Sequence, residues 1–144
     1  MFPRRSVPVL LLAACCLLAA CDVGRPPASA PQPLDGGDGR IEWRGTLPCA
    51  DCDGIEVQLM LERAGAARRY ELVETYMAEE GAARFAETGE WRQQGELIEL
   101  AGERGVARRY AVLADGRLQP RDARGRAFSR REGDVLVPAD VVAP

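Results

Sequence analysis

Residues 43–63 read WRGTLPCADCDGIEVQLMLER, and the second half of this stretch decides the fold. From Ile55 onward, apolar residues alternate with mostly polar ones, so that Ile55, Val57, Leu59 and Leu61 share one face. This period of two is typical of a β-strand with one face in the core and the other in water. The first half supplies a strand beginning near Trp43 and a turn that contains two cysteines.

Similar short stretches rich in Val, Ile, Tyr and Trp lie on both sides, separated by glycine-containing turns. The predicted strands cover residues 42–46, 55–63, 68–77, 84–93, 96–101, 106–113, 117–121 and 126–130, with a further piece at 134–137. Because closing the sheet hides its edges, we expect an all-β fold, a small antiparallel up-and-down β-barrel over residues 41–138, rather than a sandwich.

Six aromatic residues fall in or beside these predicted strands. They are Trp43, Trp91, Tyr70, Tyr110, Phe85 and Phe128. Large aromatic side chains usually fill a core, and a ligand-binding cage is the alternative. We expect them to fill the barrel.

The N-terminus has the parts of an export signal. Arg4 and Arg5 precede an apolar run from Val7 to Ala20, which ends in Leu18-Ala19-Ala20-Cys21. The run is shorter than the roughly 20 apolar residues that cross a bilayer, and this ending resembles the bacterial lipobox. We therefore predict a signal peptide at residues 1–20, removed at Cys21, which becomes lipidated and anchors the protein to a membrane. Cys15 also follows a lipobox-like sequence, but it would leave too short an apolar run.

Residues 21–40 are rich in Pro, Gly and Ala, and they predict a flexible tether between anchor and barrel. Residues 139–144 form a short tail. Asp22, directly after the anchor, resembles the signal that keeps lipoproteins in the inner membrane of enteric bacteria. The choice between inner and outer membrane stays open.

The composition limits the chemistry of the protein. The 144 residues contain no His, no Lys and no Asn, and the only serines are Ser6, Ser29 and Ser129. Ser-His-Asp and Cys-His catalytic pairs, a lysine Schiff base and imidazole metal sites are therefore excluded, and we expect no enzyme. The formal net charge of −3 also argues against a nucleic-acid partner.

The order W-x-G-x-L-P-C-A-D-C-x-G-I, followed by the alternating strand, resembles the N-terminal domain of the NlpE family of copper-resistance and envelope-stress lipoproteins. The resemblance covers residues 42 to about 137 and concerns the N-terminal domain of that family only. It implies a lipocalin-like β-barrel, an outer-membrane location facing the periplasm of a Gram-negative bacterium, a role in copper tolerance, and a partner that senses envelope stress.

Cys49 and Cys52 can play three roles. Cys15 and Cys16 leave with the signal, and Cys21 is acylated. Cys49 and Cys52 therefore remain as the one pair of thiols in an oxidising compartment, which favours a structural disulfide. Catalysis of thiol exchange is disfavoured, because Asp51 and Asp53 would raise the thiol pKa values. The third role is soft Cu(I) binding by two thiolates, with Met60 or Met77 as a third ligand.

The leading hypothesis is a membrane-anchored periplasmic lipoprotein that contributes to copper tolerance or envelope-stress sensing through its C-x-x-C loop. The alternative is a carrier barrel that holds a small apolar ligand. A ligand-shaped cavity would favour the carrier, whereas a packed interior would favour interaction through the surface.

Overall fold

A computed structural model describes residues 37–102 and 105–139 of the chain. Eight strands form one antiparallel sheet. Their bounds are β1 (Gly39–Leu47), β2 (Gly54–Ala64), β3 (Ala67–Ala78), β4 (Gly81–Gln94), β5 (Leu97–Gly102), β6 (Ala107–Val112), β7 (Leu118–Arg121) and β8 (Val137–Pro138). Among the described residues no helix has the length and hydropathy that crossing a bilayer requires. The predicted signal peptide, Cys21, most of the tether and most of the tail lie outside the described part of the chain.

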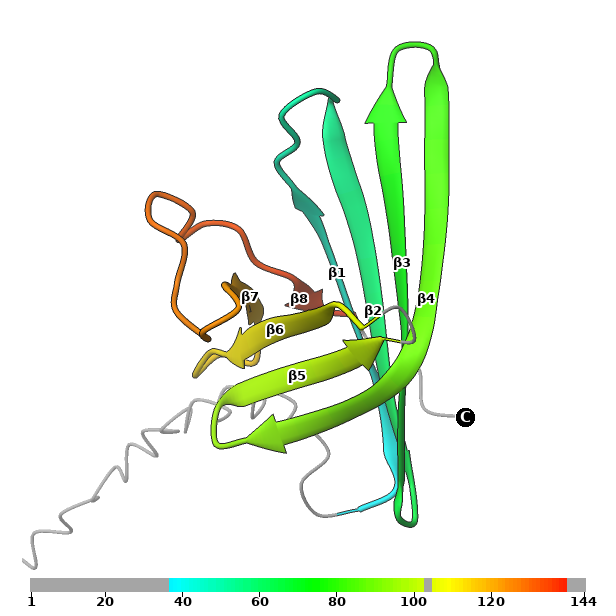
Figure 1. Ribbon diagram of the computed structural model, residues 1–144, viewed down its shortest axis with the longest axis vertical. Helices are drawn as coiled ribbons and strands as arrows, with labels where there is room; N and C mark the ends of the chain where they lie inside the picture. The colour runs from blue at the N-terminus through cyan, green and yellow to red at the C-terminus, as the bar shows by residue number, and fades with distance from the viewer. Residues whose placement is uncertain (1–36, 103–104, 140–144) are drawn as a thin grey trace, which may run out of the picture.

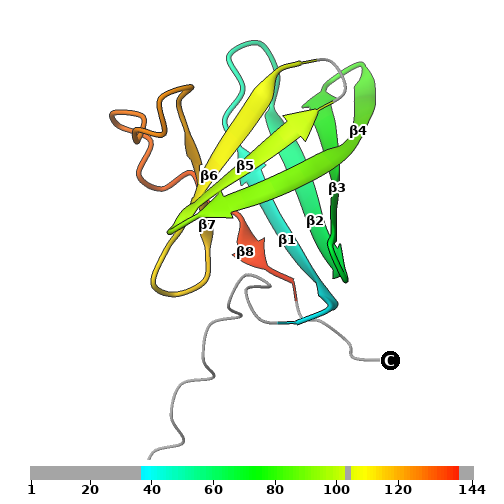
Figure 2. The ribbon, with the colours of Figure 1, turned by 60° about the horizontal axis from the view of Figure 1, so that its bottom comes forward.

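The strand order in the sheet is β7-β6-β5-β4-β3-β2-β1-β8, and the sheet curls until its two ends meet. Figure 1 shows β1 to β4 as long strands and β5 and β6 crossing them, and Figure 2 shows the curl from below. Leu136 and Leu118 exchange two backbone hydrogen bonds of 2.8 and 2.9 Å, and the next residues pair with β1. The predicted up-and-down barrel is confirmed, with a short closing segment in place of a long last strand.

Strand β4 forms the corner of the barrel. It pairs with β3 from Ala78↔Gly81 to Arg69↔Glu90, and with β5 from Gly89 onward, so only Gly89 and Glu90 have strand neighbours on both sides. Figure 1 shows β4 running along β3 and then bending across to β5. The bend divides the molecule into a closed part and an open end formed by the β3–β4 hairpin.

The alternating pattern of β2 is confirmed. Val57, Leu59 and Leu61 are buried, while the neighbouring Glu56, Gln58 and Glu62 are exposed and Met60 is half-buried. The same inward positions on the other strands fill the closed part of the barrel, since burial of apolar surface drives folding. The core comprises Ile41, Trp43, Val57, Leu59, Leu61, Tyr70, Leu72, Trp91, Ile98, Leu100, Tyr110, Leu118 and Leu136.

The prediction for the aromatic residues is wrong at two of six positions. Phe85 is 56% exposed and Phe128 is 37% exposed, whereas the other four are buried. Phe85 points inward from the first half of β4, which among the described strands pairs with β3 alone. Phe128 lies in the loop after β7, where the guanidinium of Arg131 stacks over its ring at 5.3 Å.

The predicted strand at residues 126–130 is also wrong. Only an isolated bridge between Arg121 and Ala127 forms there. The carboxylate of Asp122 accepts hydrogen bonds from the backbone N–H groups of Arg124 and Arg126, which turns the chain tightly instead of extending it. The piece expected at 134–137 is present only as Leu136 and β8.

Candidate functional site

The loop between β1 and β2 carries the two cysteines that the sequence singles out. Cys49 and Cys52 form a disulfide with their Cα atoms 5.3 Å apart. Both are half-buried, whereas Pro48, Ala50 and Asp51 are exposed. The disulfide thus fixes a short, acidic turn that projects from the open end of the barrel.

The base of this loop is joined to the end of β3. The backbone N–H of Asp53 donates to the carbonyl oxygen of Met77 at 2.8 Å, and a Cβ placed on Gly54 would lie 3.4 Å from the Met77 Cε atom. Met77 therefore lies beside the cysteine loop. Met60 does not, because it sits six residues along β2 from Gly54, a distance of roughly 20 Å along a strand.

These positions bear on the expected copper site. Within the described residues no three His, Cys, Asp or Glu side chains are grouped to hold a metal ion. Sulfur atoms joined in a disulfide are not thiolates, so the oxidised loop does not fit Cu(I). Reduction would supply two thiolates with the Met77 thioether nearby.

A second feature of the open end is a cavity of about 530 Å³. It lies on the inward side of β3 and the first half of β4, and its lining residues include Glu74, Tyr76, Phe85, Glu87 and Arg108. Tyr76 and Phe85 meet edge to face, with ring centroids 5.5 Å apart. The lining therefore combines an aromatic wall with three charged side chains.

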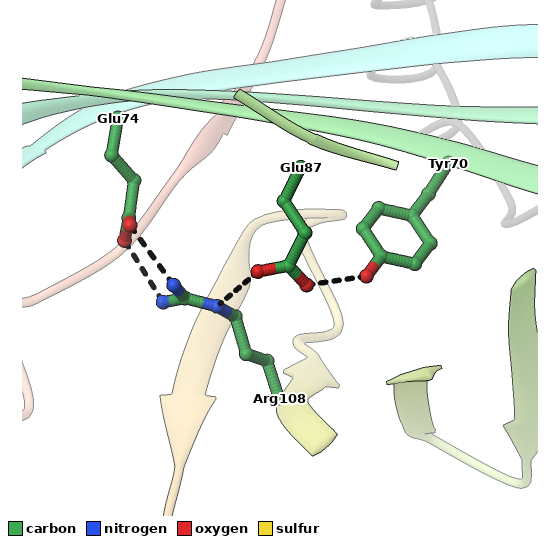
Figure 3. Close-up of polar contacts among 4 residues, drawn as sticks. All are labelled: Tyr70, Glu74, Glu87 and Arg108. Atoms are coloured by element: carbon green, nitrogen blue, oxygen red, sulfur yellow. Dashed lines mark hydrogen bonds and ion pairs between the residues drawn. The ribbon is translucent and has the colours of Figure 1, made fainter. Parts of the chain in front are cut away.

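The charged side chains form one network with Tyr70 (Figure 3). Arg108 on β6 donates two hydrogen bonds to the Glu74 carboxylate, at 2.9 and 3.0 Å, and its Nε lies 3.8 Å from Glu87. The Tyr70 hydroxyl donates to Glu87 at 2.5 Å. Such a bidentate salt bridge between guanidinium and carboxylate is stronger than a neutral hydrogen bond, and it links β6 to β3 across the cavity.

Two facing glycines leave room for this network. Gly89 and Gly102 are paired on β4 and β5. A Cβ on Gly102 would overlap the Glu87 carboxylate and lie 3.0 Å from the Tyr70 hydroxyl oxygen. The contact of Tyr70 with Glu87 thus requires the absence of a side chain at this position.

Burial perturbs the tyrosines of this region. It raises the pKa of Tyr110 to about 12, and burial together with the hydrogen bond to Glu87 raises the pKa of Tyr70 even further. For Arg108, burial alone would lower the pKa, but the carboxylates of Glu74 and Glu87 and the Tyr110 side chain outweigh it and raise the pKa. The tyrosines are therefore neutral and Arg108 is charged at physiological pH.

The tyrosine shifts predict a loss of stability at high pH. A tyrosine titrates near 10 in the unfolded chain, so between about pH 10 and pH 12 the folded state holds a proton on Tyr110 that the unfolded state has lost. The stability that the buried, neutral Tyr110 contributes to the folded state is complete below pH 10. Between pH 10 and pH 12 it falls by about 1.4 kcal/mol per pH unit. Thermal unfolding of the wild type and Tyr110→Phe over this range measures it. The variant should lose stability less steeply, and equal slopes would contradict the assignment.

The sequence did not single out Glu74, Glu87 and Arg108. A signal for Glu74 was present, because it takes an inward position in the alternation Tyr70, Leu72, Glu74. Its partner Arg108 lies 34 residues away, and only the curl of the sheet brings the two together.

Comparison with known proteins agrees with this geometry. A family model described as the NlpE N-terminal domain matches residues 43–130. Lipoprotein NlpE of Escherichia coli (strain K12) is 38% identical over 74 residues, which cover 51% of this chain and 30% of that protein. The crystal structure of the Cpx pathway activator NlpE from Escherichia coli matches with a TM-score of 0.51 and 33% identity, over 61% of this chain and 45% of that one. The chain thus matches less than half the length of these relatives, and the family match contains the cysteine loop and the cavity.

Proposed function

This chain belongs to the NlpE N-terminal domain family, and from this membership we propose that it is a lipid-anchored, non-enzymatic protein of the bacterial envelope that activates an envelope-stress pathway such as Cpx. Its anchor would be Cys21 in a Gram-negative bacterium, facing the periplasm, with the outer membrane favoured by the family and the inner membrane by Asp22. Its partner would be a stress-sensing protein of the envelope.

The observation that carries this proposal is the cysteine loop. The disulfide between Cys49 and Cys52 holds the exposed Asp51 in one short turn at the open end of the barrel. A turn held in one conformation loses less entropy when a partner binds it, so it is suited to recognition. We place the contact with the stress sensor at this loop.

The packed interior of the closed part and the charged lining of the cavity support surface recognition over the alternative of a carrier for an apolar ligand. The closed part of the barrel is filled by side chains such as Trp43 and Leu59, both fully buried. The open part holds the ion pair of Glu74 and Arg108, and an apolar ligand there would take water from charged groups without replacing its hydrogen bonds.

Replacing both cysteines by serine tests the role of the loop. The variant should lose about 2 kcal/mol of stability, the chain-entropy contribution of so short a disulfide loop, and remain folded. Transcription from a Cpx-dependent reporter, measured with the full-length chain in cells, should fall severalfold at equal protein level. Ile98→Val is the control for destabilisation, since trimming this fully buried residue of β5, outside the cysteine loop, costs roughly 0.5–1.5 kcal/mol. An equal fall in the control would assign the effect to stability, and an unchanged reporter in the serine variant would exclude the loop.

Copper tolerance is proposed to depend on the reduced form of the same loop, which a dithiol reductant of the envelope would generate by giving two electrons and two protons to the disulfide. Two thiolates of Cys49 and Cys52 with the thioether of Met77 would make a soft donor set for Cu(I). Mass spectrometry of the purified protein, before and after addition of Cu(I), counts free thiols and bound metal. Stoichiometric copper that disappears in the serine variant and weakens in Met77→Leu supports this role, while a persistent disulfide without copper contradicts it.

A further inference from the structure

The outer edge of β4 has no strand partner over its first eight residues. Residues 81–88 pair with β3 on one side, and pairing with β5 begins only at Gly89. No described residue pairs with the other side of this segment. Along a strand, successive residues direct their N–H and C=O groups to opposite sides, so about half of these groups face outward from an unpaired edge.

This segment has few of the features that oppose the addition of another strand. Natural edge strands are protected by prolines, bulges, exposed or inward-pointing charges, or by being very short, and Arg84 is the one exposed charge of this segment. Residues 81–88, GAARFAET, contain no proline and four alanine or glycine residues. Their one inward-pointing charge, Glu87, is engaged by Tyr70 and Arg108.

The cavity lies directly beside this edge. Ala83, Phe85 and Glu87 point inward from β4 into it, and Phe85 is more exposed than any other aromatic residue of the described chain. A strand added to β4 would continue the curved sheet, with every second side chain on the inward face. Those side chains would cover Phe85 and reach the carboxylates of the cavity.

The charge of this end indicates the kind of segment that fits. The cysteine loop, the β3–β4 turn, residues 81–88 and the cavity together hold six carboxylates and two guanidinium groups. They are Asp51, Asp53, Glu74, Glu79, Glu80 and Glu87, against Arg84 and Arg108. The excess of four negative charges favours a basic partner, which it would attract over roughly 10 Å at moderate salt.

We propose that residues 81–88 accept an extended, basic segment of a partner protein as an additional strand, with alternate side chains of that segment over Phe85 and the cavity. Main-chain hydrogen bonds along the edge would supply affinity, and the cavity and charges would supply selectivity. The inference rests on the proposed function only in that the protein acts by binding another protein, and it does not require any role for the disulfide.

Nuclear magnetic resonance tests the site directly. The probe is a synthetic octapeptide alternating valine and threonine with two arginines, added to isotope-labelled full-length chain with Cys21 replaced by serine to omit the lipid. We expect amide shifts confined to residues 81–88 and the cavity, and slower hydrogen exchange at alternate amides of that segment. The same peptide with glutamate in place of arginine, and one with a central proline, should each bind at least about fivefold more weakly.

Two double variants with the same change in net charge test whether the carboxylates near residues 81–88, and not the net charge of the protein, attract the peptide. Glu79→Gln with Glu80→Gln should weaken binding of the basic peptide roughly threefold to tenfold. Glu90→Gln with Glu96→Gln removes the same charge from exposed positions outside residues 81–88 and should leave binding within twofold.

Three results would overturn the proposal. They are the absence of shifts at residues 81–88 with about 1 mM peptide, equal binding of the acidic peptide, and shifts that depend on protein concentration without peptide, which would assign the edge to a second copy of the chain. The reporter assay of the cysteine variant tests the proposed function separately. The peptide can therefore fail to bind residues 81–88 while the proposed function stands, and the proposed function can fail while the peptide binds.

Discussion

Gly89→Val is expected to prevent formation of the closed barrel. A Cβ at this position would overlap the carbonyl oxygen of Ala101 on β5 and lie 2.8 Å from Cε1 of Tyr70. The overlap is with backbone, which cannot rotate away as a flexible side chain can. We expect a loss of more than about 3 kcal/mol, a large share of the 5–15 kcal/mol that stabilises a typical domain.

Thermal unfolding followed by circular dichroism measures this loss. For a domain of this size it corresponds to a fall in Tm of about 12 °C or more. Gly133→Val is the matched control, since a Cβ there meets no atom within 4 Å, and its effect should stay within about 0.5 kcal/mol. A small effect of Gly89→Val would show that β4 and β5 do not approach as closely as described.

Trp43→Ala is expected to have the second largest effect. Trp43 is fully buried in the centre of β1, and its Nε1 donates to the Gly116 carbonyl oxygen at 2.9 Å. The substitution removes the indole from a packed core and leaves that carbonyl without its partner, at a cost of about 3–5 kcal/mol. The hydrogen bond also joins β1 to the turn before β7, so the loss falls where the barrel closes.

Urea unfolding of Trp43→Ala is compared with that of two further variants, which separate the roles of the ring, the hydrogen bond and burial. Trp43→Phe retains an aromatic ring but no donor, and it should lose clearly less than the alanine variant. Phe85→Ala removes an aromatic residue that is 56% exposed, and it should cost less than about 1 kcal/mol. If Phe85→Ala were as costly as Trp43→Ala, Phe85 would be a core residue, as the sequence pattern suggested.

The position of the closing segment depends on another glycine of the motif. Gly45 lies two residues after Trp43, and a Cβ there would come within 2.6 Å of the Val135 carbonyl oxygen. The motif W-x-G therefore combines a core side chain with a place where a distant segment crosses. The sequence showed the glycine, but the segment that needs it lies 90 residues away.

The candidate site was predictable in part for the same reason. The loop with Cys49 and Cys52 is local, and its two half-cystines are three residues apart, so the sequence identified it. The network of Glu74, Glu87 and Arg108 joins three strands, and the inward position of Glu74 in the alternating pattern is its only sign in the sequence. Pairing over such separations depends on register and curl, which no single segment contains.

The sequence by itself determined the strands up to β7, because alternation with a period of two fixes which face each side chain takes, and β2 follows it from Val57 to Leu61. The tertiary structure decided which inward faces are covered. Phe85 and Trp91 both point inward from β4, yet only Trp91 lies where β5 forms the opposite neighbour and the barrel is closed. Burial requires a second element across the core, and the bend at Gly89 places that element over one half of β4 only. The exposed half is where the cavity and the unpaired edge arise.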